Sequence, residues 1–358
     1  MKTGKMIKNY YDITEQIYSQ EINELINLKL PYEKLYNKCI LITGGTGAIG
    51  RVIVDFLMSL CKKNSVYIKI IVISRDEKKA RDIFEKYWNN DNFIYFSKDV
   101  TQKFLISGSV DYIFHAASNT HPIQYAEDPI GTIITNVVGT YNLLMMAEEK
   151  KAEFILFSSV EVYGENTQNN KDFSENDFGY INCASLRAGY PEGKRVSESL
   201  CYAFSANKNV KFKIMRLARV YGATMFKDDS KAISQFFNRA IQGEQIELKS
   251  SGEQLYSYIY VMDCVSGIFT VLLKGNNEEV YNISGTDSVI TLKELAQLLG
   301  DEFQVKVIRS SASNAERKGF SKSTCAVLNN EKLRNLGWEE RTSIYEGMKK
   351  MRNLIRRV

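Results

Sequence analysis

The chain has 358 residues, of which 44% are hydrophobic and 25% are charged, and its formal net charge is +5. This composition is typical of a globular protein and excludes a largely disordered chain. The modest charge, without a block of Lys and Arg interleaved with aromatic residues, argues against nucleic acid as a partner and suits an anionic ligand such as a nucleotide diphosphate. Six scattered cysteines without a CxxC pair, and only two histidines, predict reduced thiols and no metal site.

The N-terminus lacks the apolar core of a signal peptide, and we expect no apolar run long enough to span a bilayer. We therefore predict a cytoplasmic protein that does not act at a membrane. Residues 1–37 are interpreted as an N-terminal helical extension, which Pro31 interrupts. This helix is expected to pack on the body of the protein or on a partner chain rather than on a membrane surface. Its apolar residues recur at roughly helical spacing at Ile13, Ile17, Ile22, Leu25 and Ile26.

From residue 38 onward, predicted strands alternate with predicted helices. Strands that are apolar throughout and separated by helices predict an α/β fold with a doubly wound parallel sheet, covered by helices on both faces. The predicted strands are 39–43, 68–73, 93–96, 110–115, 154–158 and 211–217, and the predicted helices are 51–61, 76–88, 130–150 and 186–206.

The pattern becomes less regular after residue 220. A helix is predicted at 231–242, a strand followed by a helix within 256–273, a strand at 280–283, a helix at 292–299 and a last helix after Trp338. We interpret residues 221–358 mainly as a smaller C-terminal substrate-binding lobe, with residues 256–283 returning to the first domain.

A glycine-rich turn follows the first predicted strand. Residues 43–50 read TGGTGAIG, which fits the pattern T-G-x-x-G-x-x-G. Small residues allow a sharp turn into a helix and bring the backbone close to a pyrophosphate, whose charge the unpaired N–H groups of the helix N-terminus bind. The position between a strand and a helix supports a dinucleotide site rather than a turn without a ligand. We therefore predict a Rossmann NAD(P)-binding domain over residues 38–220, with a cofactor loop formed by Gly44, Thr46, Gly47, Ala48, Ile49 and Gly50.

The choice between NAD and NADP depends on the tip of the second strand. NAD-binding domains usually place an acidic residue there for the ribose hydroxyls. Ser74 and Arg75 occupy this position and could receive a 2′-phosphate, which gives a slight preference for NADP. NAD stays open, because Asp76 could bind ribose in a shifted register and Arg75 could stack on adenine or be a surface cation.

A candidate catalytic set lies between residues 154 and 194. Tyr190 and Lys194 are four residues apart in a predicted helix, which places them on one face. A neighbouring ammonium lowers the pKa of a phenol from its usual value of about 10, so the phenol can act as a base near neutral pH. Ser159, at the end of the preceding strand, could hydrogen-bond the same substrate oxygen. We predict that Tyr190 takes a proton from a substrate hydroxyl and that Lys194 also orients the nicotinamide ribose.

The chain resembles the extended short-chain dehydrogenase/reductase family, in its branch of sugar-nucleotide epimerases and dehydratases. Besides the glycine loop and the Tyr–Lys pair, the resemblance rests on HAA at 115–117, NVVGT at 136–140, YIYVMD at 258–263 and LGW at 336–338. The stretch RAGYPEGKR at 187–195 is most similar to UDP-glucuronate decarboxylases. The stretch SVEVYG at 159–164 is similar to that group and to 4,6-dehydratases.

This resemblance implies a tightly bound NADP or NAD and a nucleotide-diphosphate sugar as substrate. Helices corresponding to 130–150 and 186–206 are buried in a four-helix contact in related enzymes, so we expect a homodimer. His121 is expected either at the substrate rim or on the surface. The resemblance adds Asp99, Val100, Ala116 and Ala117 to the cofactor site and places Ser118, Ser159, Arg219 and Tyr258 at the substrate.

Two departures from the family pattern bear on the reaction. Dehydratases of this branch carry adjacent Asp and Glu after the hydroxyl residue, whereas here Val160 stands in the Asp position and only Glu161 is acidic. Valine cannot donate a proton, so elimination of water is disfavoured. Family members usually have Asn before the later Tyr-Gly pair, whereas this chain has Arg219. This arginine could bind a diphosphate or a substrate carboxylate, or could form a structural ion pair, and the same alternatives hold for Arg216.

We therefore predict an enzyme that transiently oxidises C4 of a nucleotide-linked sugar and regenerates its nicotinamide cofactor in each turnover. Epimerisation or decarboxylation is favoured over 4,6-dehydration. The alternative is a net NAD(P)H-dependent reductase or dehydrogenase of a nucleotide-linked sugar. The candidate catalytic residues are Ser159, Glu161, Tyr190 and Lys194, although Glu161 could also be an inert acid on a loop rim.

Overall fold

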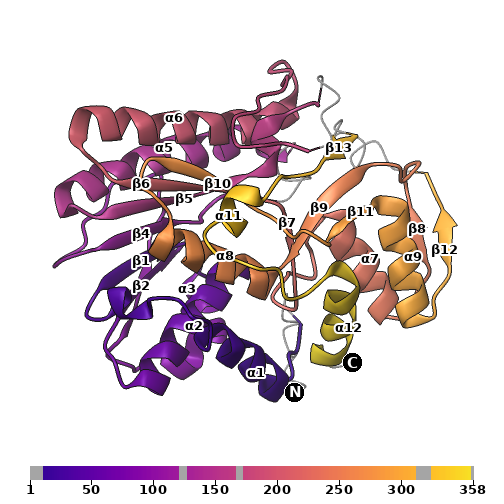
Figure 1. Ribbon diagram of the computed structural model, residues 1–358, viewed down its shortest axis with the longest axis horizontal. Coiled ribbons are helices and arrows are strands. Elements are labelled where there is room, and N and C mark those ends of the chain that lie inside the picture. The colour runs from indigo at the N-terminus through magenta and orange to yellow at the C-terminus, as the bar shows by residue number, and fades with distance from the viewer. Residues whose placement is uncertain (1–10, 121–126, 167–171, 312–323, 356–358) are drawn as a thin grey trace, which may run out of the picture.

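The computed structural model describes residues 11–120, 127–166, 172–311 and 324–355. Its largest element is a seven-stranded parallel sheet with the strand order β10-β6-β5-β4-β1-β2-β3 (Figure 1). The strands of this sheet are β1 (Cys39–Thr43), β2 (Lys69–Ser74), β3 (Phe93–Ser97), β4 (Tyr112–His115), β5 (Glu153–Ser159), β6 (Phe212–Leu217) and β10 (Glu279–Ile283).

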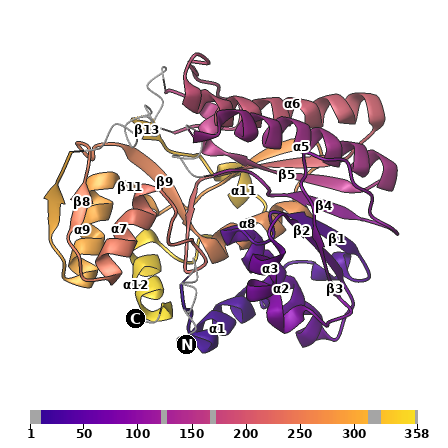
Figure 2. The ribbon, with the colours of Figure 1, turned by 180° about the vertical axis from the view of Figure 1, so that it is seen from behind.

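Helices cover both faces of this sheet. One face carries α5 (Pro129–Lys150) and α6 (Gly189–Lys208), which lie side by side in Figures 1 and 2. The other face carries α2 (Ala48–Asn64), α3 (Glu77–Phe84) and α8 (Val261–Lys274). Successive residues of each strand alternate between the two faces, so Leu41 packs toward α5 and α6, whereas Ile40 and Ile42 pack toward α2 and α8. Burial on both faces explains why these strands are apolar throughout.

The strand order reverses between β1 and β4. Thr43 at the end of β1 pairs with Ile73 of β2 on one side and with His115 of β4 on the other. Loops leaving β1 and β4 turn to opposite faces of a doubly wound sheet, which opens a crevice at their carboxyl ends. This arrangement is the Rossmann fold, and the predicted fold class is confirmed.

The chain leaves the large sheet after β6 and builds a smaller lobe before it returns. Strand β9 (Leu255–Tyr260) lies in the small lobe and pairs with β7 (Arg219–Tyr221), β11 (Val289–Thr291) and β13 (Cys325–Ala326). Only α8 and β10 of the segment 256–283 belong to the large domain. The other elements of the lobe are β8 (Ile246–Leu248), β12 (Val307–Arg309), α7 (Ala232–Ile241), α9 (Leu292–Phe303) and α12 (Ile344–Leu354), and the short α11 (Glu331–Arg334) lies near β10.

The N-terminal extension forms α1 (Glu15–Ile26), followed by a 3-10 turn at Tyr32–Leu35 just after Pro31. This helix packs on α2 and α8 of the same chain. The Tyr18 hydroxyl donates to Asp55 over 2.9 Å, and the Tyr260 hydroxyl donates to Glu21. The apolar face of α1 is therefore buried against α2 and α8 of the same chain.

The expectation that no segment is long and apolar enough to span a bilayer is wrong. Helix α5 has 22 residues and meets both criteria by length and composition alone. It packs on the large sheet and, along one side, against α6, and these contacts require apolar side chains on more than one side of the helix. Part of its apolar surface is exposed, including Ile133 and Met145.

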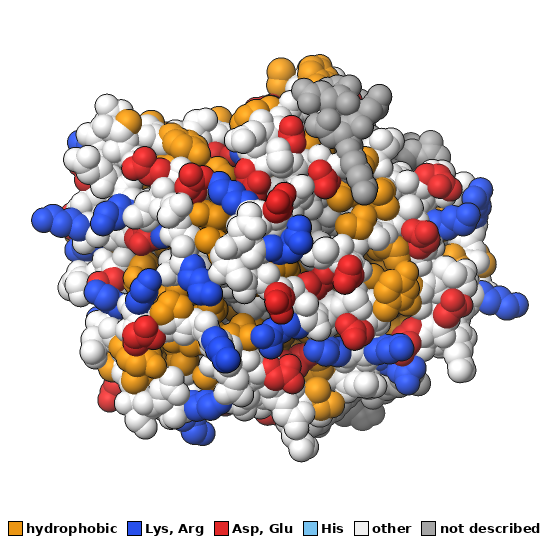
Figure 3. Space-filling view, in the orientation of Figure 1, with side chains coloured by type: hydrophobic (Ala, Val, Ile, Leu, Met, Phe, Trp, Pro, Cys, Tyr) orange, Lys and Arg blue, Asp and Glu red, His pale blue; other side chains and the backbone are white. Residues whose placement is uncertain are grey.

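The surface carries charges of both signs. On the face shown in Figure 3, Lys and Arg side chains alternate with Asp and Glu, with hydrophobic patches between them. This face therefore has no basic stripe of the kind that follows a nucleic-acid backbone.

Candidate active site

A cavity of about 620 Å³ lies between the carboxyl edge of the large sheet and the small lobe. All the residues predicted for cofactor, substrate and catalysis line it, from Gly44 in the first loop to Tyr258 in β9. His115 is fully buried and does not line the cavity, and His121 lies outside the described residues. The cavity therefore brings together side chains that are far apart in the sequence.

The glycine loop presents bare backbone to this cavity. Gly44 has φ +68°, and a Cβ atom on it would lie 2.8 Å from the Ala116 carbonyl carbon and the Ala117 nitrogen. A Cβ on Gly50 would lie 2.5 Å from the Gly44 oxygen, so larger residues cannot be accommodated at either position. Helix α2 begins after Gly47 without a side-chain cap. Its first N–H groups are thus available to an anion, which fits the pyrophosphate of a dinucleotide.

The tip of β2 carries the residues expected at the adenosine ribose. The Ser74 hydroxyl hydrogen-bonds the Tyr95 hydroxyl at 3.1 Å, and Arg75 is exposed. Asp76 caps α3 by accepting a hydrogen bond from the Lys79 backbone N–H. The Lys79 amine lies 3.8 Å from the centre of the Phe226 ring, which comes from the small lobe.

The strand ends β3 and β4 complete the cofactor side of the cavity. Asp99 accepts a hydrogen bond from the Thr101 backbone over 2.9 Å, while Val100 is buried beside Gly139 of α5. His115 beneath the loop stays neutral, because burial and the charge of Lys194 lower its pKa to about 3. Ser118 lies at the cavity wall and donates a hydrogen bond to Asn136 over 2.9 Å.

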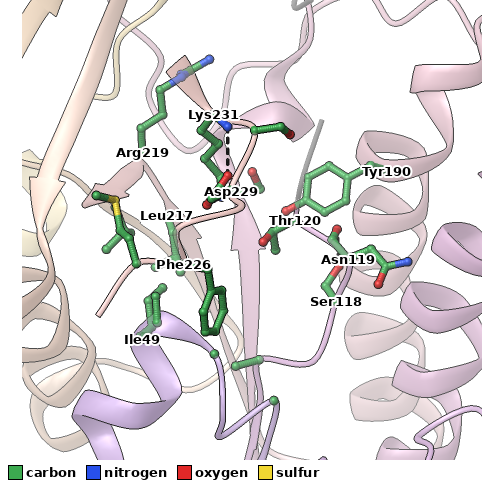
Figure 4. Close-up of a pocket in the computed structure, with 18 of the residues that line it drawn as sticks. Ile49, Ser118, Asn119, Thr120, Tyr190, Leu217, Arg219, Phe226, Asp229 and Lys231 are labelled. Carbon is green, nitrogen blue, oxygen red and sulfur yellow. Dashed lines mark hydrogen bonds and ion pairs between the residues drawn. The ribbon is translucent and has the colours of Figure 1, made fainter. Parts of the chain in front are cut away.

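Ser159, Tyr190 and Lys194 all line the cavity. Ser159 ends β5, and its hydroxyl accepts a hydrogen bond from the Glu161 backbone N–H over 3.2 Å. Tyr190 is the second residue of α6, and Figure 4 shows its ring directed into the cavity. Lys194, one helical turn later, donates to the Phe157 carbonyl over 2.7 Å. The cavity wall therefore carries a phenol, an ammonium and a hydroxyl, which are groups that can transfer a proton from a substrate alcohol.

The Lys194 ammonium is partly destabilised by its surroundings. Burial lowers its pKa, the negative charge of Glu198 raises it, and the result is about 8. Because Lys194 carries its charge below this pH and loses it above, we expect kcat to fall as the pH rises through about 8. A pH profile of initial rates between 6 and 10 measures this alkaline limb, and a rate that stays constant to pH 10 would contradict the assignment.

Glu161 lies between two arginines. Its Oε2 is 2.9 Å from Arg187 Nη1, and its Oε1 is 3.8 Å from Arg219 Nη2. Burial opposes ionisation of Glu161, but the two guanidinium groups outweigh it and lower the pKa. Glu161 is therefore a carboxylate at neutral pH. Val160 beside it is buried and has no acidic group. Neither Val160 nor the ionised Glu161 therefore carries a proton that a departing hydroxyl could take.

Arg219 keeps part of its hydrogen-bonding capacity. Its guanidinium lies 3.5 Å from the centre of the Tyr256 ring, and its Nη1 atom is buried without a hydrogen-bond partner among the described residues. Arg187 makes the shorter contact with Glu161, which leaves Arg219 able to receive an anion. Arg216 differs, because it is buried in an ion pair with Glu198 at 2.8 Å and donates to the Glu175 carbonyl.

Comparison with known proteins identifies the family. The model of the "NAD dependent epimerase/dehydratase family" matches residues 40–284, which is more than half of the chain. This chain belongs to the NAD-dependent epimerase/dehydratase family. The resemblance inferred from the sequence is confirmed, and the protein is an enzyme of this family.

The relatives of this epimerase/dehydratase include decarboxylases. It is 32% identical over 316 residues to UDP-glucuronic acid decarboxylase 3 of Arabidopsis thaliana, with 87% of each chain covered. It is 30% identical to UDP-glucuronic acid decarboxylase 1 of Xenopus tropicalis, with 98% of this chain and 84% of the relative covered. Among solved structures, the dTDP-glucose 4,6-dehydratase of Streptomyces venezuelae with NAD bound has a TM-score of 0.75 at 22% identity. That match covers 88% of this chain and 96% of the dehydratase.

Sequence reasoning missed several residues of this epimerase/dehydratase site. Arg187 was not predicted as a site residue, although a cation three residues before Tyr190 could have indicated it. Lys79, Phe226 and the ion pair between Asp229 and Lys231 also line the cavity, and the pair appears as a dashed line in Figure 4. Nothing in the local sequence indicates that Phe226 contacts α3.

Proposed function

We propose that this enzyme decarboxylates a nucleotide-linked hexuronic acid of the UDP-glucuronic acid type, through transient oxidation at C4. The observation that carries the proposal is Arg219, whose partly unpartnered guanidinium lies in the same cavity as Ser159 and Tyr190. A C6 carboxylate is the anion that distinguishes a hexuronic acid from a hexose, and guanidinium groups bind carboxylates well. The names of the relatives support the same substrate class.

The residues of the site fit this chemistry. Tyr190 takes the proton of the C4 hydroxyl, Ser159 hydrogen-bonds the same oxygen, and Lys194 favours the anionic form of the phenol. The glycine loop and the start of α2 would hold a nicotinamide dinucleotide, which when bound supplies the acceptor for the C4 hydride. A C4 ketone makes the hexuronic acid a β-keto acid, so the C5–C6 bond can break, carbon dioxide leaves, and the electron pair moves onto the C4 oxygen beside Ser159 and Tyr190.

Elimination of water is not supported by the same residues. It requires an acid for the departing C6 hydroxyl, whereas Val160 is apolar and Glu161 is ionised. Decarboxylation requires no such acid at C6. The ion pair with Arg187 therefore favours loss of carbon dioxide over loss of water.

The test is incubation with UDP-glucuronic acid without added reductant, followed by mass spectrometry and proton NMR of the product. We expect a UDP-linked pentose that has lost one carbon dioxide, with no net change in NAD(P)H absorbance. An unchanged mass with inverted stereochemistry would make the enzyme an epimerase. A net change in absorbance would make it a reductase or dehydrogenase, and a 4-keto-6-deoxy product from UDP-glucose would overturn the argument from Val160.

We also propose a preference for NADP within this NAD-dependent family. Ser74 and Arg75 stand where an acid would bind the ribose diol, and the cations Lys79 and Lys98 line the same end of the cavity. Asp76 uses its carboxylate as a helix cap. We expect mass spectrometry of the cofactor released by denaturation to find NADP, and Arg75→Gln to shift the occupancy toward NAD. Release of NAD alone would mean that Arg75 has another role.

A homodimer through α5 and α6 is a third part of the proposal. These helices carry side chains that are 40–74% exposed although they are large and apolar, namely Ile130, Ile133, Ile134, Tyr141, Met145, Val196 and Tyr202. Burying such a surface against its copy stabilises a dimer. We expect light scattering at micromolar concentration to give twice the chain mass and Ile133→Glu to give a monomer. Leu105→Glu, at an exposed apolar residue elsewhere, should leave the mass unchanged, and a monomeric wild-type protein would refute the contact.

A further inference from the structure

The segment before α1 reaches the small lobe. Tyr11 is buried, and its ring packs edge-on against Phe237 of α7 with 5.5 Å between the ring centroids. The Thr14 backbone N–H donates to the Leu354 carbonyl at the end of α12 over 2.7 Å. The same segment continues into α1, which is packed on α2 and α8 of the large domain. Residues 11–26 therefore contact both domains that enclose the cavity.

Asn238 connects Tyr11 to a loop of the cavity. The Tyr11 hydroxyl donates to Asn238 Oδ1, and Asn238 Nδ2 donates to the Lys227 carbonyl over 2.6 Å. Burial raises the pKa of Tyr11, and the nearby charge of Asp229 raises it further. The hydroxyl therefore keeps its proton and remains a donor over the whole physiological range.

The loop at 225–231 touches both ends of the cavity. At the cofactor end, the Phe226 ring lies against the Lys79 amine of α3. Figure 4 places the Phe226 ring near Ile49 of the glycine loop. Farther along the loop, Lys231 pairs with Asp229 at 2.8 Å on the cavity wall. A displacement of this loop would change the contacts of both ligands.

We propose that Tyr11 is a positioning residue that holds the 225–231 loop through Asn238 and thereby sets the affinity of the cavity for cofactor and nucleotide sugar. The substrate half of this inference rests on the function proposed above. The cofactor half requires only that the enzyme binds a nicotinamide dinucleotide. The N-terminal extension thus contributes to ligand binding, although none of its described residues, 11–37, lines the cavity.

The test uses the full-length protein with Tyr11→Phe, which keeps the ring against Phe237 and removes only the hydroxyl. We expect dissociation of NADPH and of NADH, followed by nicotinamide fluorescence, to become about fivefold faster, as the loss of one buried hydrogen bond suggests. The KM for UDP-glucuronic acid should rise about as much while kcat changes less than twofold. Asn238→Ala should likewise raise KM and speed cofactor dissociation with little change in kcat. In the double variant, KM and the dissociation rate should not exceed those of either single variant.

Tyr18→Phe is the matched control. It removes a tyrosine hydroxyl from the same N-terminal segment, but this hydroxyl donates to Asp55 of α2 and makes no bond to α7. We expect it to leave cofactor dissociation and KM unchanged. Equal effects of Tyr11→Phe and Tyr18→Phe, or no effect of Tyr11→Phe on cofactor dissociation, would overturn the inference. If the wild-type enzyme does not turn over UDP-glucuronic acid, the proposed substrate is wrong, and cofactor dissociation still decides the role of Tyr11.

Discussion

Replacement of Tyr190 by phenylalanine is expected to lower kcat by about 100- to 10,000-fold, which is the usual contribution of a positioned acid–base group. In the proposed reaction, the phenolate of Tyr190 accepts the proton of the C4 hydroxyl as hydride leaves C4, so loss of this base should slow the oxidation. The ring itself fills a buried position at the start of α6, so phenylalanine should preserve the packing. The measurement is initial product formation from UDP-glucuronic acid.

The control for this variant is Tyr345→Phe, on α12. Tyr345 is 55% exposed and does not line the cavity, so its hydroxyl should be dispensable. The Tyr190 variant should also retain wild-type thermal stability and bound cofactor, which would exclude a folding defect. A Tyr190→Phe enzyme that keeps a tenth of the wild-type rate would remove Tyr190 from the role of the base.

Arg219→Gln is expected to lower kcat/KM for UDP-glucuronic acid by about 10- to 100-fold. Loss of a charge-assisted hydrogen bond costs about 1.5–3 kcal/mol, and each 1.4 kcal/mol corresponds to a factor of ten. Glutamine keeps much of the stem that packs near Tyr256 but removes the charge. The loss should be confined to the substrate with a carboxylate, so the affinity for UDP-glucose, measured by calorimetry, should change less than threefold.

This comparison separates the roles that the sequence left open for Arg219. Equal losses for UDP-glucuronic acid and UDP-glucose would mean that the guanidinium binds the diphosphate, which both ligands share. A large fall in thermal stability without a change in selectivity would mean that Arg219 is a structural partner of Glu161. Arg219→Lys should give an intermediate loss, because an ammonium keeps the charge without the bidentate geometry.

The sequence predicted the parts of the site that depend on local structure. The glycine loop follows its strand directly, and Tyr190 and Lys194 are one helical turn apart, so a few adjacent residues determine each geometry. Ser159 was found for the same reason, because it ends an apolar strand. The large sheet could also be predicted from the sequence, since its strands are continuous apolar runs.

Contacts between distant segments could not be predicted. Arg187 approaches Glu161, and Tyr11 approaches Asn238, only because the fold brings different elements together. Apart from β9, the strands of the small lobe were missed because each has only two or three residues, too few for a periodic pattern. The helix at 130–150 was predicted, but its apolar character was underestimated.

The path of the chain has a consequence for synthesis on the ribosome. Strand β6 pairs on one side with β5, and its other neighbour, β10, is translated only after β7, β8, β9 and α8. Until then the nascent large domain has an unpaired apolar edge at Phe212–Leu217. The unpaired backbone groups of such an edge can pair with a strand of another nascent chain, which leads to aggregation. A fragment that stops near residue 220 would keep this edge permanently, so the cofactor domain should be produced with the small lobe rather than alone.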